Sequence, residues 1–281
     1  MGIFDGCLLA CDIDGTLVSG ELLPERNIEK IEYFVKEGGS FSLATGRTAA
    51  ALSMITSKIN NIAPSVLSNG CVIYYFRKGA PISQKCLSPN SFLYMIKGAI
   101  EKCGIGIEMH SADKILVTKR SAASDLHERY EMMTADFISL EATCRHDINK
   151  IIYFVEEESQ YELLEELALK HQNDCTFYRT CAFIEGVKQN YYEQLPKGVS
   201  KADALKELCG ILNIKKGGFF AIGDYYNDVP MLKAADISAV PSGSPDDIKA
   251  NATTVVGDAS CGAVADFINY LEVRLTNGQA N

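Results

Sequence analysis

The residues best suited to chemistry are carboxylates gathered at two places far apart in the chain. Asp12 and Asp14 lie in the run 12–16, and Asp224 and Asp228 lie in the run 223–228. Four carboxylates in one cleft would repel one another strongly, and a hard cation such as Mg²⁺, which prefers oxygen ligands, would relieve that repulsion. The added positive charge would then attract an anionic phosphoryl group.

Other residues in the sequence could hold and transfer such a group. The hydroxyl of Thr45, the ammonium of Lys201 and backbone N–H groups near Gly46 could bind phosphoryl oxygens. One carboxylate can attack as the nucleophile and form an aspartyl-phosphate, while a second donates and accepts protons. Asp12 and Asp14 could divide these tasks, because side chains at positions i and i+2 of an extended segment point the same way.

The polar clusters follow short apolar runs or begin helices, in the order strand, polar loop, helix, strand. This order is typical of a parallel sheet with crossover helices, in which ligands bind beyond the carboxyl ends of the strands. The predicted strands cover residues 7–11, 41–44, 64–67, 219–222, 237–240 and 253–256. The predicted helices of this part cover residues 24–36, 49–59 and 201–212.

A different texture lies between these halves, because the polar clusters at strand ends are absent there. Residues 79–81 and 186–198, which are rich in glycine or contain proline, predict hinges on either side. We therefore expect an α/β fold: a Rossmann-like core of parallel strands formed by residues 1–82 and 188–281, with an α+β domain inserted at residues 83–187. The insert is predicted to hold helices near 89–102, 121–132 and 161–171 and strands near 105–109, 114–117, 151–155, 177–178 and 182–184.

Composition excludes several classes of protein and partner. The 281 residues are 47% hydrophobic and 22% charged, as in an ordinary globular chain, and the formal charge of −9 disfavours nucleic acid as a partner. No apolar stretch approaches the roughly 18 residues that span a bilayer, so no membrane partner is expected. The ten cysteines are scattered and no signal peptide is visible, which predicts reduced cysteines and a cytoplasmic location.

In combination and in this order, the motifs resemble those of a known family. The run 12–16, the sequence Thr45-Gly46-Arg47, Lys201 and the run 223–228 look like the four motifs of the haloacid dehalogenase superfamily of phosphatases. The inserted region resembles the large α/β cap of the Cof-type branch. The resemblance covers essentially the whole chain.

The resemblance implies a role for each matching residue. Asp12 is implied to be the nucleophile and Asp14 the general acid and base, with Thr45 and Lys201 completing the catalytic set. Phosphate binding is implied for Thr45, Gly46, Lys201 and Asn227. The implied cofactor is Mg²⁺, held by Asp12, Asp14 through its backbone carbonyl, Asp224 and Asp228.

These roles predict a Mg²⁺-dependent phosphomonoester hydrolase that acts through an aspartyl-phosphate. The expected partner is a small phosphorylated metabolite, with a sugar phosphate favoured, and the inserted cap is expected to close over the cleft. Two alternatives stay open, a phosphomutase of a sugar phosphate and a sensor that binds a phosphorylated metabolite without turnover. Nothing in the sequence indicates an oligomeric state.

Several residues also have an ordinary structural interpretation. Arg47 could touch phosphate or pair with a nearby acid, and Asn69 could form a turn or line the cleft. Tyr225 and Tyr226 stand where the relatives commonly have small or polar residues, and they could narrow the entrance. The histidines lack close metal-ligand spacing and are interpreted as structural or surface residues: His110, His127, His146 and His171.

Overall fold

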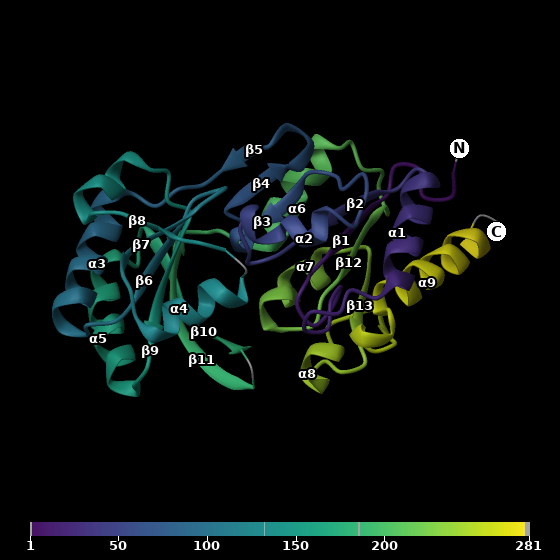
Figure 1. Ribbon diagram of the computed structural model, residues 1–281. Helices are drawn as coiled ribbons and strands as arrows, with labels where there is room; N and C mark the ends of the chain where they lie inside the picture. Colours follow the sequence, from purple (N-terminus) through teal and green to yellow (C-terminus); the bar gives the residue numbers. More distant parts are fainter. Residues whose placement is uncertain (1, 132, 185, 279–281) are drawn as a thin grey trace. The chain divides into compact units, whose positions relative to one another are not determined.

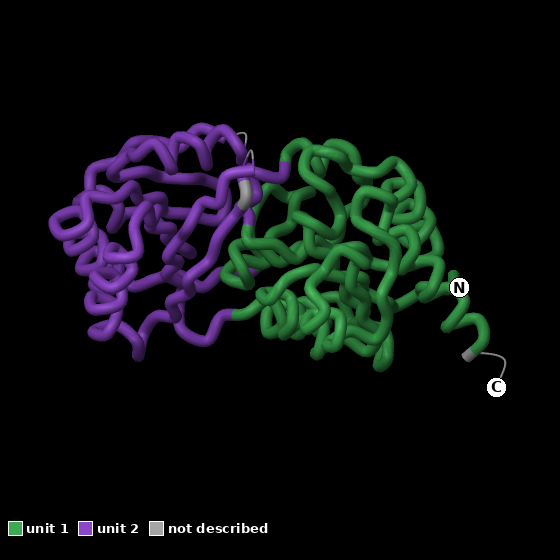
Figure 2. The backbone as a smooth tube through the Cα atoms, turned by 90° about the horizontal axis from the view of Figure 1, so that it is seen from below, with its two compact units in different colours: residues 1–46, 53–82, 200–281 green, residues 47–52, 83–199 purple. Residues whose placement is uncertain are grey.

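The protein folds as two compact units, seen here in a computed structural model that describes residues 2–131, 133–184 and 186–278. Unit 1 comprises residues 1–46, 53–82 and 200–281, and unit 2 comprises residues 47–52 and 83–199 (Figure 2). Unit 2 is therefore an insertion into unit 1. The short segment 47–52 belongs to unit 2 although it directly follows residue 46 of unit 1.

Unit 1 is built on a five-stranded parallel sheet with the strand order β14-β13-β12-β1-β2. Every residue of the central strands β1 and β12 is buried, which accounts for their continuously apolar sequences. The strands of this sheet are β1 (Leu8–Cys11), β2 (Ser40–Leu43), β12 (Phe219–Ile222), β13 (Ile237–Pro241) and β14 (Thr254–Val256).

Helices cover both faces of this sheet (Figure 1). On one face α1 packs against α9 and β2, and α9 also contacts β13 and β14. On the other face Leu205 of α6 and Met231 of α7 join Leu8 and Ala10 of β1 in one buried cluster. The helices of unit 1 are α1 (Glu25–Lys36), α2 (Ser53–Thr56), α6 (Lys201–Ile211), α7 (Val229–Ala234), α8 (Asp246–Lys249) and α9 (Ala263–Gly278).

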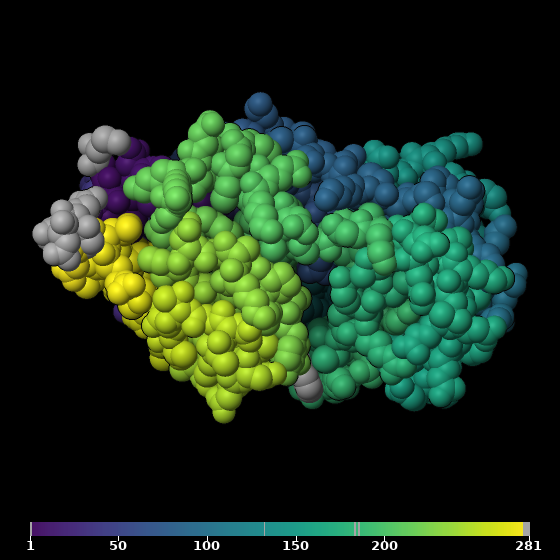
Figure 3. Space-filling model, turned by 180° about the vertical axis from the view of Figure 1, so that it is seen from behind, coloured from purple at the N-terminus to yellow at the C-terminus, as the bar shows by residue number. Residues whose placement is uncertain are grey.

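A small three-stranded sheet, β3-β4-β5, completes unit 1. A parallel bridge between Ala44 and Val66 joins it to the chain just beyond β2. Its strands are β3 (Ser65–Leu67), β4 (Val72–Tyr75) and β5 (Ala80–Gln84). The space-filling view in Figure 3 shows the yellow residues of α9 on the outside of unit 1, where Val273 is exposed.

The helix predicted over residues 49–59 is wrong in its extent. The structure has a single 3₁₀ turn at Ala50–Leu52, followed by the one-turn helix α2. The chain passes from unit 2 back to unit 1 between Leu52 and Ser53, and the N–H of Ala49 bonds to the carbonyl of Ala112 in unit 2. The N–H of Leu52 bonds to the carbonyl of Ala49, three residues earlier, so this first turn is a 3₁₀ turn and not part of an α-helix.

Unit 2 contains a six-stranded sheet with the order β10-β11-β9-β6-β7-β8. Its strand pairs are antiparallel except for β7 and β8. A parallel sheet with helices in unit 1 and a mixed sheet in unit 2 confirm the predicted fold class, an α/β core with an α+β cap. The strands are β6 (Ile107–His110), β7 (Ile115–Lys119), β8 (Asp136–Phe137), β9 (Lys150–Val155), β10 (Cys175–Ile184) and β11 (Val187–Pro196).

The two faces of the unit 2 sheet bury different side chains. On one face Ile151 and Tyr153 of β9 form an apolar core with α3 (Pro89–Lys102) and α5 (Glu158–Ala168). On the other face Ile152 and Phe154 pack with Ala123 of α4 (Ala122–Tyr130). This second face also carries charged residues, which are described below.

The hairpin β10–β11 differs from the sequence-based expectation. Residues 177–178 and 182–184 were predicted as two short strands, but they belong to one strand that pairs with β11 from end to end. Residues 186–198, predicted as a hinge, form strand β11 from Val187 to Pro196, and unit 2 extends to Val199 where the sequence places the return to the core at 188. The exposed start of β11 is polar, so its composition resembles that of a linker although it is a strand.

Among the described residues, no helix is both long enough and apolar enough to cross a membrane.

Candidate active site

The register of the parallel sheet brings two of the polar clusters to one edge. Cys11, the last residue of β1, is aligned with Ile222 of β12 and with Leu43 of β2. The hydrogen bonds continue beyond the strands, since Asp12 N donates to the carbonyl of Ile222 at 2.9 Å. Asp12 therefore leaves the sheet between the segment that leads to Thr45 and the run 223–228.

Lys201 joins two of the carboxylates that come from different strands. It is the first residue of α6, a helix whose start is capped by the hydroxyl of Ser200. Its Nζ lies 2.7 Å from Oδ1 of Asp12 and 2.6 Å from Oδ1 of Asp228. All three side chains are buried, so these charge-assisted hydrogen bonds are shielded from water.

Hydrogen bonds within the 223–228 loop fix the remaining carboxylate. Oδ2 of Asp228 accepts the N–H groups of Asp224 at 3.1 Å and of Tyr225 at 3.2 Å. The hydroxyl of Thr16 donates to Oδ1 of Asp224 at 3.1 Å. A Cβ at Gly15, whose φ is +77°, would lie 2.4 Å from Oδ2 of Asp224, so only glycine permits this approach.

The electrostatics of the cluster show an excess of negative charge. Burial raises the pKa of Asp12 well above its usual range, and the charge of Asp228 raises it further, while Lys201 acts in the opposite direction. Burial and the charge of Asp228 likewise raise the pKa of Asp224 to about 7. Burial alone would lower the pKa of Lys201, but Asp12 and Asp228 raise it by more, so the ammonium stays charged.

Three carboxylates of this cluster fit a divalent cation. One oxygen each from Asp12, Asp224 and Asp228 lie within 4.8 Å of one another. Carboxylate oxygens are suitable ligands for a hard cation, and one Lys201 ammonium leaves two of the three negative charges unbalanced when all are ionised. The raised pKa values of Asp12 and Asp224 have this imbalance as one of their causes, alongside burial.

Thr45 and Gly46 lie in a tight turn next to Asn69. Thr45 is buried, its N–H donates to Val66, and its carbonyl accepts the N–H of Asn69 at 3.0 Å. A Cβ on Gly46 would lie 3.0 Å from Oδ1 of Asn69. Asn69 has a left-handed φ of 58°, which is a turn conformation, and its side chain also lies against the Thr45-Gly46 turn.

The other predicted site residues lie at the margins of the cluster. Asp14 is half-buried in the tight turn after β1, in a bridge with Val18. Asn227 is exposed in the single 3₁₀ turn at Tyr226–Asp228. Tyr225 and Tyr226 are both about half exposed, and the hydroxyl of Tyr226 donates to Asp247 of α8 at 3.0 Å.

Sequence reasoning missed two residues that shape this edge of the sheet. Thr16 was noted only as part of the first motif, yet its hydroxyl holds Asp224. Gly70 has a φ of +102°, and a Cβ there would lie 2.3 Å from the carbonyl of Ser200, the cap of α6. The signal for Gly70 was the pair Asn69-Gly70 directly after a strand, which marks a special backbone position without saying what approaches it.

Comparison with curated proteins finds relatives that match most of this chain. At 24% identity the chain matches a chloroplastic endoribonuclease of Arabidopsis thaliana over 92% of its own length but only 45% of that protein. It matches a pyridoxal phosphate phosphatase of Escherichia coli at 21% identity, covering 93% of this chain and 97% of the relative.

Solved structures share the fold over nearly the whole chain. A haloacid dehalogenase-like hydrolase from Bacteroides thetaiotaomicron superposes with a TM-score of 0.83 at 18% identity, covering 94% of this chain and 99% of the other. A haloacid dehalogenase subclass IIB sugar phosphatase superposes with a TM-score of 0.78 at 22% identity, covering 95% and 99%. Residues 9–268 match the family described as haloacid dehalogenase-like hydrolase, so the chain belongs to that family.

Proposed function

We propose that the protein is a Mg²⁺-dependent phosphomonoester hydrolase that works through an aspartyl-phosphate on Asp12. The observation that carries this proposal is the position of Asp12, which accepts a 2.7 Å hydrogen bond from Lys201 beside two further carboxylates. A nucleophile needs a fixed orientation and a nearby positive charge that accommodates an incoming anion. Lys201 supplies both for Asp12.

The reaction divides between two aspartates. Oδ2 or Oδ1 of Asp12 attacks phosphorus, the bond from phosphorus to the ester oxygen breaks, and Asp14 gives its proton to that leaving oxygen. Asp14 then takes a proton from water as the water oxygen attacks phosphorus. The Asp12–phosphorus bond breaks, and inorganic phosphate and the free Asp12 carboxylate are released.

The groups that hold the phosphoryl oxygens come from the ends of neighbouring elements. Thr45 offers a hydroxyl, Gly46 a backbone N–H, Lys201 an ammonium and Asn227 a side-chain amide. Mg²⁺ would be held by Asp12, Asp224 and Asp228 and by the backbone carbonyl of Asp14, and it would supply positive charge that offsets the charge of the phosphoryl group.

The substrate class we propose is a small sugar phosphate, hydrolysed to the sugar and phosphate. This proposal is supported by the likeness to a subclass IIB sugar phosphatase along nearly the whole chain. The likeness to a pyridoxal phosphate phosphatase makes a phosphorylated cofactor the first competitor to include in a screen.

The test is phosphate release from a panel of sugar phosphates, nucleotides and phosphorylated cofactors, with and without Mg²⁺. Asp12→Asn removes the nucleophile and is expected to abolish release. Asp174→Asn, a substitution of an exposed aspartate in unit 2, is the matched control and should leave release unchanged.

The outcomes separate the competing functions. Release that needs Mg²⁺ and is lost in Asp12→Asn supports the hydrolase, and the ranking of the panel tests the sugar phosphate. An isomerised sugar phosphate without free phosphate would indicate a mutase. Binding of phosphorylated metabolites without any turnover would indicate a sensor and overturn the proposal.

A further inference from the structure

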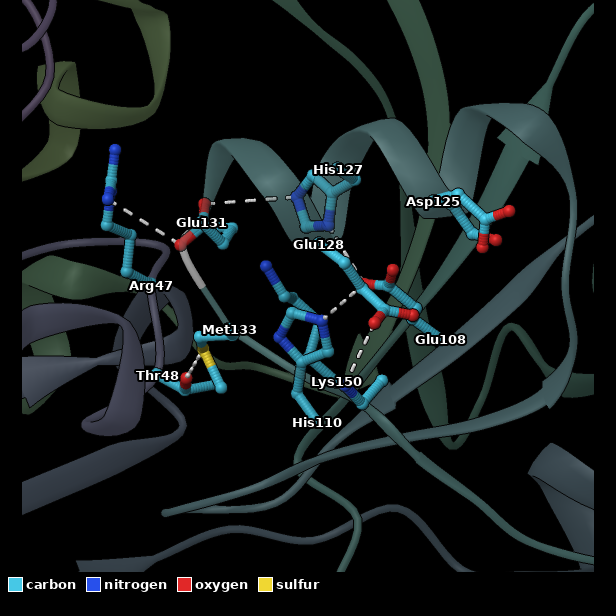
Figure 4. A network of polar contacts seen from close by, with 12 residues as sticks. Arg47, Thr48, Glu108, His110, Asp125, His127, Glu128, Glu131, Met133 and Lys150 are labelled. Atoms are coloured by element: carbon cyan, nitrogen blue, oxygen red, sulfur yellow. Dashed lines mark hydrogen bonds and ion pairs between the residues drawn. The ribbon is translucent and has the colours of Figure 1, made fainter.

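A buried network of charged side chains lies on the second face of the unit 2 sheet, and the proposed chemistry uses none of it. Figure 4 shows His127 of α4 placed over Glu108 and His110 of β6, with Glu131 at the end of α4. Nδ1 of His127 lies 2.9 Å from Oε2 of Glu108, and its Nε2 lies 3.9 Å from Oε1 of Glu131. One imidazole thus faces a carboxylate on each side.

Glu131 also faces Arg47, which directly follows the Thr45-Gly46 turn. Nη1 of Arg47 lies 3.6 Å from Oε2 of Glu131, and both side chains are nearly buried. Of the two alternatives for Arg47, pairing with an acid is the one that the structure shows. Because residues 47–52 belong to unit 2, the phosphate-binding turn is covalently continuous with a segment that this ion pair holds.

Three side chains that can carry a positive charge face three carboxylates around His127. Arg47, His127 and Lys150 are the cations, and Lys150 lies 3.7 Å from the carboxylate of Glu193 on β11. Glu108, Glu131 and Glu193 are the anions. Burial and the charge of Lys150 lower the pKa of His110 to about 4, so His110 is neutral near pH 7.

The two carboxylates that face His127 favour its charged form, while the charge of Lys150 opposes it. Burial by itself lowers the pKa of His127, but the hydrogen bond and charge of Glu108, with the charge of Glu131, raise it by more. The ionisable groups around it are Glu108 and His110 from β6, Lys150 from β9, Tyr191 from β11, Glu131 at the end of α4 and, beyond Glu131, Arg47.

Loss of the His127 proton changes the side of the ring that faces Glu131. The shorter contact, to Glu108, keeps a proton on Nδ1 of His127. Nε2 is therefore the atom that loses its proton and presents a lone pair. A lone pair facing Oε1 of Glu131 repels that carboxylate where the imidazolium attracted it. The carboxylate that holds Arg47 then loses the group that fixes its other oxygen.

We propose that Glu131 and His127 are positioning residues of the phosphate-binding turn, acting through Arg47, and that deprotonation of His127 loosens the turn. This inference rests on the proposed function only in assuming that the Thr45-Gly46 turn binds phosphate. The movement of the turn itself is a property of this chain and can be measured without any substrate.

The primary experiment follows the amide of Gly46 and the ring protons of His127 by NMR of the full chain as pH is raised. We expect the Gly46 amide shift to change with the same midpoint as His127. In Glu131→Gln, which keeps the size of the side chain and removes its charge, the Gly46 inflection at that midpoint should disappear. His146→Gln, at an exposed histidine outside the network, is the matched control and should keep it.

The second experiment measures binding of inorganic phosphate in the presence of Mg²⁺ across the same pH range. Phosphate itself titrates in this pH range, and His127→Gln measures the effect of that titration alone. Above the His127 midpoint, the affinity of the wild type should fall by at least about fivefold more than that of His127→Gln. Arg47→Met should weaken binding and Arg47→Lys should recover part of it. The double variant Arg47→Met/Glu131→Gln should bind no more weakly than Arg47→Met alone.

The possible results of these experiments distinguish the inference from the proposed function. A Gly46 amide that ignores the His127 midpoint, or that still follows it in Glu131→Gln, overturns the inference whatever the protein hydrolyses. Phosphate binding that depends on His127 in a protein that hydrolyses no phosphoester would overturn the proposed function and leave the positioning role intact. Additive losses in the double variant would show that Glu131 does not act through Arg47.

Discussion

The ammonium of Lys201 lies 2.7 Å from the carboxylate of Asp12, and both side chains are buried at the carboxyl edge of the parallel sheet. Asp12 is the first residue beyond β1 and Lys201 the first residue of α6, so their contact depends on the packing of that helix against the sheet. The same ammonium also donates to Asp228 at 2.6 Å, so Lys201 holds two buried carboxylates together.

Lys201→Met is therefore expected to destabilise the protein and to abolish hydrolysis. The substitution leaves two buried carboxylates without their cation, which costs about 3–5 kcal/mol in comparable buried pairs. Mg²⁺ should restore part of that loss, because the proposed metal site consists of the same carboxylates and Asp224. Urea unfolding with and without Mg²⁺ measures both effects, and Lys206→Met, at an exposed lysine of α6, is the control. Equal unfolding midpoints for the two variants would contradict this account.

Gly15→Ala is expected to weaken Mg²⁺ binding by at least about tenfold. Its Cβ would lie 2.4 Å from Oδ2 of Asp224 and would push that ligand out of place. Gly20→Ala is a matched control, because Gly20 also has a positive φ, +60°, but nothing within 4 Å of an added Cβ. Both variants carry a similar backbone strain of about 1 kcal/mol, so only the contact differs. Calorimetric titration with Mg²⁺ compares them, and equal affinities would show that Asp224 is not a ligand.

The parallel core was predictable from the sequence because its signals are local. Strand β1 is a short apolar run that ends in polar residues, and β12 repeats that pattern, so both their burial and the edge that they share could be inferred. The order of the motifs along the chain indicated the family. Lys201 was a candidate because it begins a predicted helix, but its place in the catalytic set beside Asp12 could be assigned only through that resemblance, since nothing within α6 distinguishes it from a surface lysine.

The failures have physical causes that a single sequence does not carry. The polar start of β11 resembles a linker, and it is a strand because β9 and β10 pair with it from distant positions. The helix expected over residues 49–59 is interrupted because its first turn packs into unit 2. The partner of Arg47 is Glu131, a residue whose approach depends on the fold of the whole insert.

Asn27 supports the first motif from a position that sequence reasoning did not single out. Its Nδ2 donates to the carbonyl of Leu17 and its Oδ1 accepts the N–H of Ala265, both at 3.0 Å, and the side chain is fully buried. Asn27→Ala would leave both backbone groups unpaired, so we expect a loss of about 2–4 kcal/mol in unfolding free energy. Asn60→Ala, at an exposed asparagine, should change it by less than about 0.5 kcal/mol. A small effect at Asn27 would mean that water replaces its bonds.

The charged network of unit 2 should make the free energy of unfolding decrease below neutral pH. Each titrating group contributes over its own pH range, which lies between its pKa values in the unfolded and folded chain. The pKa of His110 is lowered to about 4 from 6.5, so between these pH values His110 is protonated in the unfolded chain but not in the folded chain. The stability that this supplies is present above pH 6.5 and is lost as pH falls from 6.5 to 4, in total about 3 kcal/mol.

Two neighbours of His110 act in other windows and allow its contribution to be isolated. Burial opposes the charge of Glu108, but hydrogen bonds from His110 and His127 lower its pKa to about 2, so its contribution is lost only between pH 4.5 and 2. The raised pKa of His127 has the opposite sign, since its contribution is present in acid and is lost as pH rises through that pKa. His110→Gln should therefore flatten the dependence of the unfolding free energy on pH between 6.5 and 4, whereas His146→Gln should keep the wild-type slope. A slope that persists in His110→Gln would assign the acid sensitivity to other groups.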